Sequence, residues 1–193
     1  MTLLVVGLII FLGVHSLRIV AEPWRQAQIA RRGAGPIKGV YALVSLLGLL
    51  LIVSGYASAR AQPIALWSPP PAALRHIAAL LVLLAFVLVT AAYVPGNGIK
   101  ARLHHPMVLG VKAWALGHLI ANHTLADALL FGSFLAWAVA SFIAARRRDR
   151  AAGTVYPPGV ASRTAITVVV GTLAWAGFAF WAHGALFGVR PFG

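Results

Sequence analysis

The chain alternates between long apolar stretches and short polar or basic segments. Apolar runs of about 17–25 residues are long enough to cross a bilayer as helices. The pattern predicts spanning helices at about 2–21, 40–58, 72–93, 124–144 and 164–187, and a shorter helix at 106–120. Pro106 suits the start of the shorter helix, because proline lacks an N–H that the first helical turn does not use. We therefore expect an all-α integral membrane bundle of about six transmembrane helices, forming one domain over residues 1–193.

The short helix at 106–120 has an alternative arrangement. It lies at the lower limit of the length needed for a full crossing, so it and the next helix can instead form a re-entrant or half-buried hairpin. The predicted turn between them is Asn122-His123-Thr124, and Thr124-Leu125-Ala126-Asp127 resembles a capping box that opens the next helix. The polar segments 22–38 and 146–163 are predicted to be loops.

The composition indicates a membrane protein and argues against several classes of catalytic and metal-binding site. Hydrophobic residues make up 61% and charged residues 10% of the sequence, whereas a soluble domain carries about 25% charged residues. The only acidic residues are Glu22, Asp127 and Asp149, which leaves little material for catalysis by a carboxylate pair. The absence of cysteine excludes disulfides, thiolate zinc sites, iron–sulfur clusters and covalent attachment of c-type haem. A bound metal would therefore depend mainly on histidine.

The basic residues predict how the chain crosses the membrane. The net charge is +13, but lysine and arginine gather in alternate loops, which is typical of membrane topology and does not indicate nucleic-acid binding. The basic loops are 22–38, 100–102 and 146–163. The positive-inside rule places them in the cytoplasm and both termini on the other side. The first helix lacks the basic start and the cleavage pattern of a signal peptide, so we expect it to be retained.

Two histidines lie within predicted membrane helices. His15 is in the first helix and His118 in the short one. A titratable side chain in lipid is costly and is a functional candidate for that reason. Histidines on different helices of a bundle are the arrangement that holds a b-type haem or another metal between helices. The alternative is that each histidine hydrogen-bonds a neighbouring helix.

Three further residues accompany these histidines as candidate cofactor contacts. Trp114 precedes His118 by four residues and shares its helix face. Arg18, one turn after His15, can pair with a haem propionate or extend to the membrane interface, and Lys112 has the same two interpretations. The remaining histidines are expected to be polar caps, although His183 could form a second site; they are His76, His104, His105, His123 and His183.

The motifs resemble those of a known family. The matching segments follow the same order over essentially the whole chain: FLGVHSLR, KGVYALVSL, GYASAR, AAYVPGNGIKARLHHPMVLGVKAWALGHLIAN, LADALLFGSFLAWA, RRRDR and FWAHGALFGVRP. They resemble the NnrU family, which implies a protein of the bacterial cytoplasmic membrane associated with denitrification and with nitrite and nitric oxide reduction.

A distant plant relative of that family, 15-cis-zeta-carotene isomerase, holds haem b. Its ligand motifs resemble His15-Ser16 and Trp114 to His118, which implies haem b ligated by His15 and His118. The relative's exchangeable cysteine ligand corresponds to Ala115, so its ligand switching is not implied here.

Three hypotheses of function follow. The first is a haem-dependent redox, sensing or maturation role in nitrite and nitric oxide metabolism, with a redox partner protein. The second is a haem-dependent isomerase or oxidoreductase acting on an apolar polyene. The third is a structural membrane protein without a cofactor.

Overall fold

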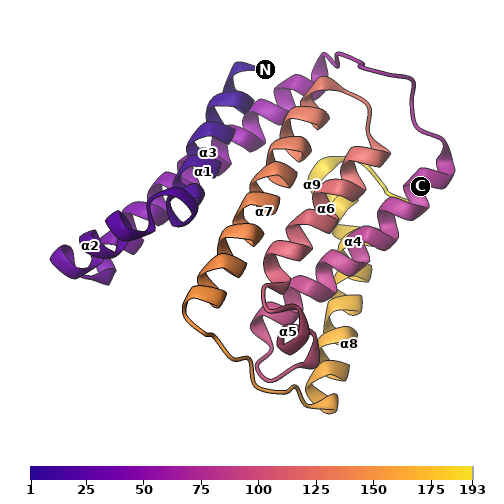
Figure 1. Ribbon diagram of the computed structural model, residues 1–193. Coiled ribbons are helices and arrows are strands. Elements are labelled where there is room, and N and C mark those ends of the chain that lie inside the picture. The colour runs from indigo at the N-terminus through magenta and orange to yellow at the C-terminus, as the bar shows by residue number, and fades with distance from the viewer. Residues whose placement is uncertain (193) are drawn as a thin grey trace. The chain divides into compact units, whose positions relative to one another are not determined.

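The structure, a computed structural model that describes residues 1–192, is built from helices (Figure 1). In chain order they are α1 (Thr2–Val20), α2 (Glu22–Arg32), α3 (Ala34–Ala61), α4 (Ala72–Tyr93), α5 (Gly98–Leu103), α6 (Pro106–Ala121), α7 (Leu125–Ala151), α8 (Ala161–Gly177), the π-helix η1 (Phe178–Ala182) and α9 (His183–Phe187). Extended pairing within these residues is limited to isolated bridges, Ala65 with Thr124 and Asn97 with Val160. The predicted all-α class is confirmed.

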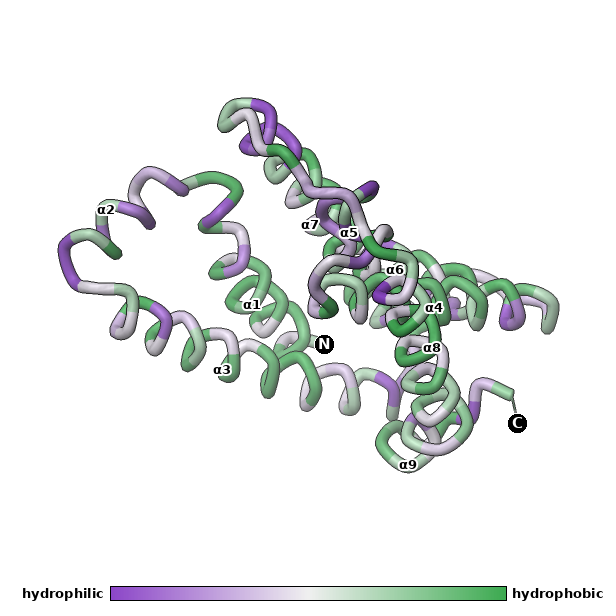
Figure 2. Tube along the Cα trace, turned by 90° about the horizontal axis from the view of Figure 1, so that it is seen from below, coloured by the Kyte–Doolittle hydropathy of each residue, from purple (hydrophilic) through white to green (hydrophobic). Residues whose placement is uncertain are grey.

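Within residues 1–192, five helical segments are long and apolar enough to cross a membrane: Thr2–Val20, Ala34–Ala61, Ala72–Tyr93, Leu125–Ala151 and Ala161–Phe187. The helix α6 is apolar but shorter, as predicted. Figure 2 shows hydrophobic residues along the long helices and hydrophilic residues concentrated in α2 and at the end of α7. The chain is therefore a multi-pass membrane protein with five long apolar helices and one short one.

The two segments predicted to be loops are helical in part, whereas residues 152–160 are not helical, as predicted. Residues 22–32 form α2, where Arg25 and Gln26 bond to Glu22 one turn earlier. Gly33, with φ 83°, ends α2, and α3 begins directly afterwards. The helix α7 continues through the basic run to Ala151, because arginine is a good helix former and a cation suits a helix C-terminus.

The chain forms two compact units, each made of two separate stretches of sequence. The first unit comprises Met1–Ser68 and His123–Ala144, and the second comprises Pro69–Asn122 and Ala145–Gly193. The first contains α1, α2, α3 and most of α7, whereas the second contains α4, α5, α6, α8, η1 and α9.

In the first unit, glycines let α1 and α3 meet backbone to backbone. A Cβ added to Gly7 would lie 2.6 Å from the Ile52 nitrogen, and one added to Gly55 would lie 2.2 Å from the Leu4 nitrogen. Small residues at such positions allow membrane helices to approach closely and gain van der Waals contact. Leu4 is fully buried where the two helices meet.

The start of α7 is fixed in the same unit by a buried carboxylate. Asp127 accepts hydrogen bonds from the backbone N–H of Thr124 at 3.1 Å and from its hydroxyl at 2.6 Å. The Tyr56 hydroxyl of α3 donates to the other carboxylate oxygen at 2.5 Å. The predicted cap of Thr124 and Asp127 is therefore confirmed, and Asp127 also joins α7 to α3.

In the second unit, α6 and α8 pack on α4 through a similar use of small residues. A Cβ added to Gly110 or Gly117 of α6 would lie 3.0 Å or 3.1 Å from a carbonyl oxygen of α4. Gly171 of α8 faces the backbone of Val87, where a Cβ would lie 2.7 Å from the α-carbon. This packing holds α6, which carries His118, against α4.

Candidate functional site

His15 lies in an aromatic environment inside the first unit. Its ring stacks on Phe11 with 4.1 Å between centroids, and the rings of Tyr41 and Trp137 lie at 5.1 Å and 6.0 Å. Phe11 comes from α1, Tyr41 from α3 and Trp137 from α7, so three helices surround the imidazole. We call these three side chains the aromatic cage of His15.

The backbone determines which nitrogen of His15 can bind a metal. Nδ1 lies 2.6 Å from the carbonyl oxygen of Phe11, four residues earlier. A carbonyl only accepts, so Nδ1 must carry the proton and Nε2 holds the lone pair of the neutral ring. Metal-binding histidines characteristically donate their second N–H in this way, which fixes the tautomer and the ring orientation.

The aromatic cage also contains a buried donor. The Trp137 Nε1–H is buried and has no hydrogen-bond acceptor among residues 1–192. Leaving a buried donor unpaired costs about 1–3 kcal/mol, so such groups are usually satisfied by water or a ligand. The first unit thus provides an imidazole nitrogen suited to a metal and, within the cage around it, an N–H suited to an acceptor.

Arg18, the other predicted contact in this unit, is exposed at the end of α1. Nearby, Glu22 of α2 forms a two-point ion pair with Arg25, with both N–O distances 2.7 Å. That pairing lowers the pKa of Glu22 to about 2, and the positive charge of Arg18 contributes less to the same shift. Arg18 therefore lies within electrostatic reach of a carboxylate of its own chain.

His118 repeats the arrangement of His15 in the second unit. Its Nδ1 lies 2.9 Å from the carbonyl oxygen of Trp114, again four residues earlier, so Nε2 again holds the lone pair. The Trp114 ring is 5.3 Å from the imidazole, as the shared helix face predicted. Asn122 donates to the His118 carbonyl at 2.8 Å and caps this end of the helix.

Lys112 does not share that face. It precedes His118 by six residues, which places the two side chains about 120° apart around α6. Of the three candidates in this unit, Trp114 and His118 are in contact, whereas Lys112 lies on a different face of α6.

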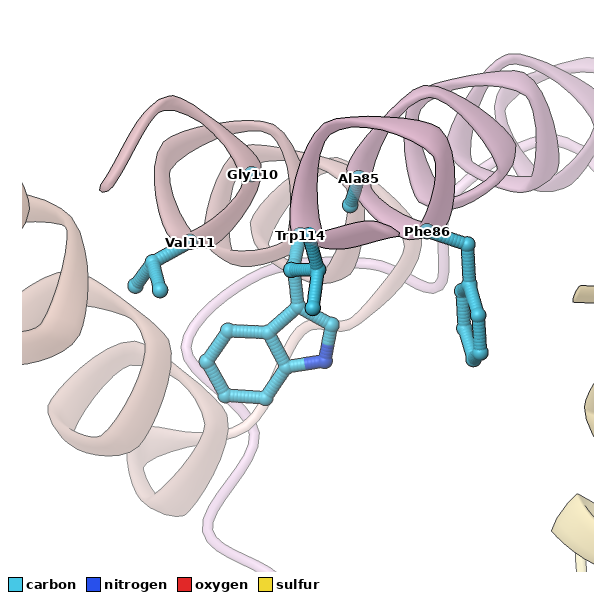
Figure 3. Close-up of a pocket in the computed structure, with 6 residues that line it drawn as sticks. Ala85, Phe86, Gly110, Val111 and Trp114 are labelled. Carbon is cyan, nitrogen blue, oxygen red and sulfur yellow. The ribbon is translucent and has the colours of Figure 1, made fainter. Parts of the chain in front are cut away.

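An apolar pocket adjoins Trp114 within the second unit. Its volume is about 200 Å³, and it is lined by Ala85, Phe86, Val89, Gly110, Val111 and Trp114. Figure 3 shows Gly110 and Ala85 where α6 and α4 meet, with the Trp114 and Phe86 rings directed to the same side of the helix pair. This pocket suits an apolar group one helical turn from His118.

Three of the other histidines also have partners in the second unit. In the second unit His105 Nε2 lies 2.7 Å from Asp149, which also accepts from the Tyr156 hydroxyl at 3.0 Å. The His104 ring stacks on Tyr156, with 4.0 Å between centroids, and its Nδ1 contacts Arg146. His183 Nδ1 lies 2.6 Å from the Val189 carbonyl near the end of the chain.

The nitrogen that the imidazoles of His15 and His118 each present is of the kind that ligates haem iron. Within residues 1–192, no three side chains of the ligating types His, Asp or Glu gather to hold an ion. A six-coordinate haem iron needs only two axial ligands from the protein, since the porphyrin supplies the others. His15 and His118 each present the required nitrogen.

The structure adds residues that the sequence did not indicate. Phe11 could have been found, because it lies four residues before His15 on one helix. Tyr41 and Trp137 come from other helices, and nothing in their spacing relates them to His15. The link between Asp149 and His105 likewise depends on tertiary packing.

Comparison with known proteins identifies a family. The family model described as NnrU protein matches residues 3–191, nearly the whole chain. No curated protein matches the chain. No solved structure matches it either.

Proposed function

The chain belongs to the NnrU family, and from that premise we propose that it is a membrane protein that binds haem b through His15 and His118. Its role, as the family resemblance implies, lies in redox chemistry, sensing or maturation for nitrite and nitric oxide metabolism. The observation that carries the proposal is the matching state of the two imidazoles. Each histidine lies within an apolar helix and donates Nδ1–H to the carbonyl four residues earlier.

That hydrogen bond favours ligation in two ways. It selects the neutral tautomer whose Nε2 lone pair can bind iron, and it restricts rotation of the ring. For His15, the stacking on Phe11 restricts the ring further. Restricting the ring in advance reduces the conformational entropy that the side chain would lose on binding iron. The imidazoles would therefore be oriented for ligation before haem binds.

Other side chains would orient and enclose the group. Trp137 would donate its unpaired Nε1–H to an acceptor on the cofactor or to a water beside it. Trp114 and the apolar pocket would exclude water near His118. Arg18, exposed at the end of α1, would pair with a propionate while remaining near Glu22. Haem b, when bound, supplies reversible one-electron chemistry.

The test is the absorption spectrum of protein purified from haem-replete cells. We expect the wild type to show a six-coordinate low-spin haem, and His15→Ala and His118→Ala each to lose that spectrum. Added imidazole should restore it in either variant, which would show that the protein still folds and still binds haem. His105→Ala and His123→Ala should leave the spectrum intact.

His183→Ala is the matched control for the hydrogen-bond argument. His183 also has Nδ1 against a backbone carbonyl, but it lies near the end of the chain, at the start of α9. The spectrum of this variant should be unchanged. Loss of six-coordinate haem in His183→Ala, or a colourless wild type, would contradict the proposal. The metabolic role is tested separately, since a strain lacking the chain should accumulate nitrite or nitric oxide during denitrifying growth.

The apolar pocket supports a second candidate function, the conversion of an apolar polyene. Only apolar surface lines it, so a hydrocarbon could enter without leaving a polar group unpaired. Val89→Trp would fill the pocket. We expect that variant to lose turnover of a cis-polyene while its haem spectrum stays intact. If the wild type fails to convert the polyene, this second candidate is wrong.

A further inference from the structure

A groove in the second unit lies between α5 and the first turns of α8. Its volume is about 660 Å³, within the usual range for ligand sites, about 300–1,000 Å³. Apolar and small residues form most of its lining, together with one cation; they are Gly98, Ile99, Arg102, Gly159, Ala161, Thr164, Ala165, Val168 and Val169. The groove shares no lining residue with the pocket beside Trp114.

Hydrogen bonds connect the start of α5 with the start of α8 beside the groove. Gly98 donates its N–H to the Thr164 hydroxyl at 2.8 Å, and Val160 donates to the Gly96 carbonyl at 2.8 Å. Gly159 lies so close to Gly98 that an added Cβ would be 2.2 Å from its nitrogen. The start of α5 is thus fixed against the start of α8, and the groove is a preformed feature.

The apolar wall belongs to a helix that is long and apolar enough to cross the membrane. Val168 and Val169 of α8 are 43% and 56% exposed, so this stretch presents hydrocarbon to its surroundings. They lie about 10 Å along the axis from Ala161, at a rise of about 1.5 Å per residue. Exposed valines at this distance along an apolar helix favour contact with a lipid acyl chain.

The charge of the second unit favours an anionic occupant. Within its residues the sequence has ten basic side chains, Arg75, Lys100, Arg102, Lys112, Arg146, Arg147, Arg148, Arg150, Arg163 and Arg190, and one acidic side chain, Asp149. Asp149 already accepts from His105 and Tyr156. Cations of this unit therefore greatly outnumber its acidic side chains, and an anion from outside can balance Arg102, which lines the groove.

From these observations we propose that the groove binds one anionic phospholipid. Its phosphate pairs with the Arg102 guanidinium, and one acyl chain lies along Val168 and Val169. Basic pockets between membrane helices are recognised sites for acidic headgroups. The inference is independent of haem binding.

The experiment is native mass spectrometry of the full-length protein in detergent, titrated with phosphatidylglycerol or with phosphatidylcholine of the same acyl chains. We expect one phosphatidylglycerol to be retained in preference to phosphatidylcholine. Arg102→Gln should weaken its binding about fivefold, the effect of one basic residue on an anionic lipid. Val168→Trp should weaken it by filling the groove, and because Val168 is exposed the fold should tolerate the change.

Two matched controls distinguish an effect at the groove from the effect of losing a cation elsewhere in the unit and from the effect of adding a large side chain elsewhere on α8. Arg75→Gln removes an exposed cation of the same unit away from the groove, and Val170→Trp adds the same bulk to an exposed position of α8 that does not line it. Both should bind the lipid as the wild type does. Equal loss in a control and its test variant, or equal retention of the two lipids, would overturn the proposal. Displacement by inorganic phosphate alone would show an anion site without an acyl chain and would overturn it as well.

Discussion

Replacing Gly55 by alanine tests the closest helix contact in the first unit. A Cβ at this position would lie 2.2 Å from the Leu4 nitrogen and 2.7 Å from both the Leu3 carbonyl carbon and the Leu4 α-carbon. All three atoms are backbone, so no side chain can rotate away. To reach an ordinary contact of 3.4 Å, the nitrogen and the new Cβ must separate by 3.4 − 2.2 = 1.2 Å. The helices α1 and α3 must therefore move apart.

That separation should destabilise the protein by about 1–3 kcal/mol, the usual cost of overpacking. Alanine favours a helix over glycine by about 1 kcal/mol, so the two effects oppose each other. The matched control is Gly13→Ala on α1, where an added Cβ has no atom within 4 Å among the described residues. Gly13→Ala should gain the helix propensity without the clash and become slightly more stable.

The measurement is thermal unfolding in detergent, followed by tryptophan fluorescence. We expect Gly55→Ala to melt below the wild type and Gly13→Ala to melt at or above it. If Gly55→Ala were as stable as Gly13→Ala, the backbone contact between α1 and α3 would be wrong. The same displacement should move Tyr41 of α3 relative to His15 and lower haem retention, a second readout that depends on the proposed function.

Further predictions concern a buried bond, pH and topology. Tyr56→Phe should cost about 1–3 kcal/mol in thermal unfolding, because it leaves a buried Asp127 oxygen without its 2.5 Å donor; a neutral effect would contradict that bond. Burial raises the pKa of Tyr156, and the hydrogen bond to Asp149 raises it further. The neutral phenol therefore contributes stability below about pH 10, and that stability is lost as the pH rises through the pKa of the folded state. Tyr156→Phe should therefore flatten the alkaline loss of stability. A phosphatase reporter at the C-terminus should be active and one after Arg150 silent, and the reverse pattern would refute the predicted orientation.

The apolar pattern predicted most helix positions well. The helix at 72–93 coincides with α4, and the short helix from Pro106 differs from α6 by one residue. Prediction failed where polarity was taken to mean a loop. Residues 22–32 and 146–151 are polar and helical, because local side-chain bonds and the helix propensity of arginine act without apolar contacts.

In the candidate site, the sequence could predict only contacts between residues of the same helix. The contact of Trp114 with His118 followed from four-residue spacing. The contact of Trp137 with His15 could not be predicted, since the two are 122 positions apart and only the packing of α7 brings them together. Whether His15 and His118 bind the same iron stays a prediction, because each histidine is fixed within its own unit.

A geometric relation links the helix packing to the histidines. His15 follows Gly7 by eight residues on α1, and His118 follows Gly110 by eight on α6. Eight residues amount to about two turns and a further 80°. Each histidine therefore points to the side of its own helix, about 80° away from the face on which the glycine packs against the partner helix. A side chain on that side is held by a rigid backbone and is covered only in part by the partner helix, as Tyr41 of α3 covers His15. This explains why both imidazoles are half-buried, and it is the placement that a ligand to an inserted cofactor requires.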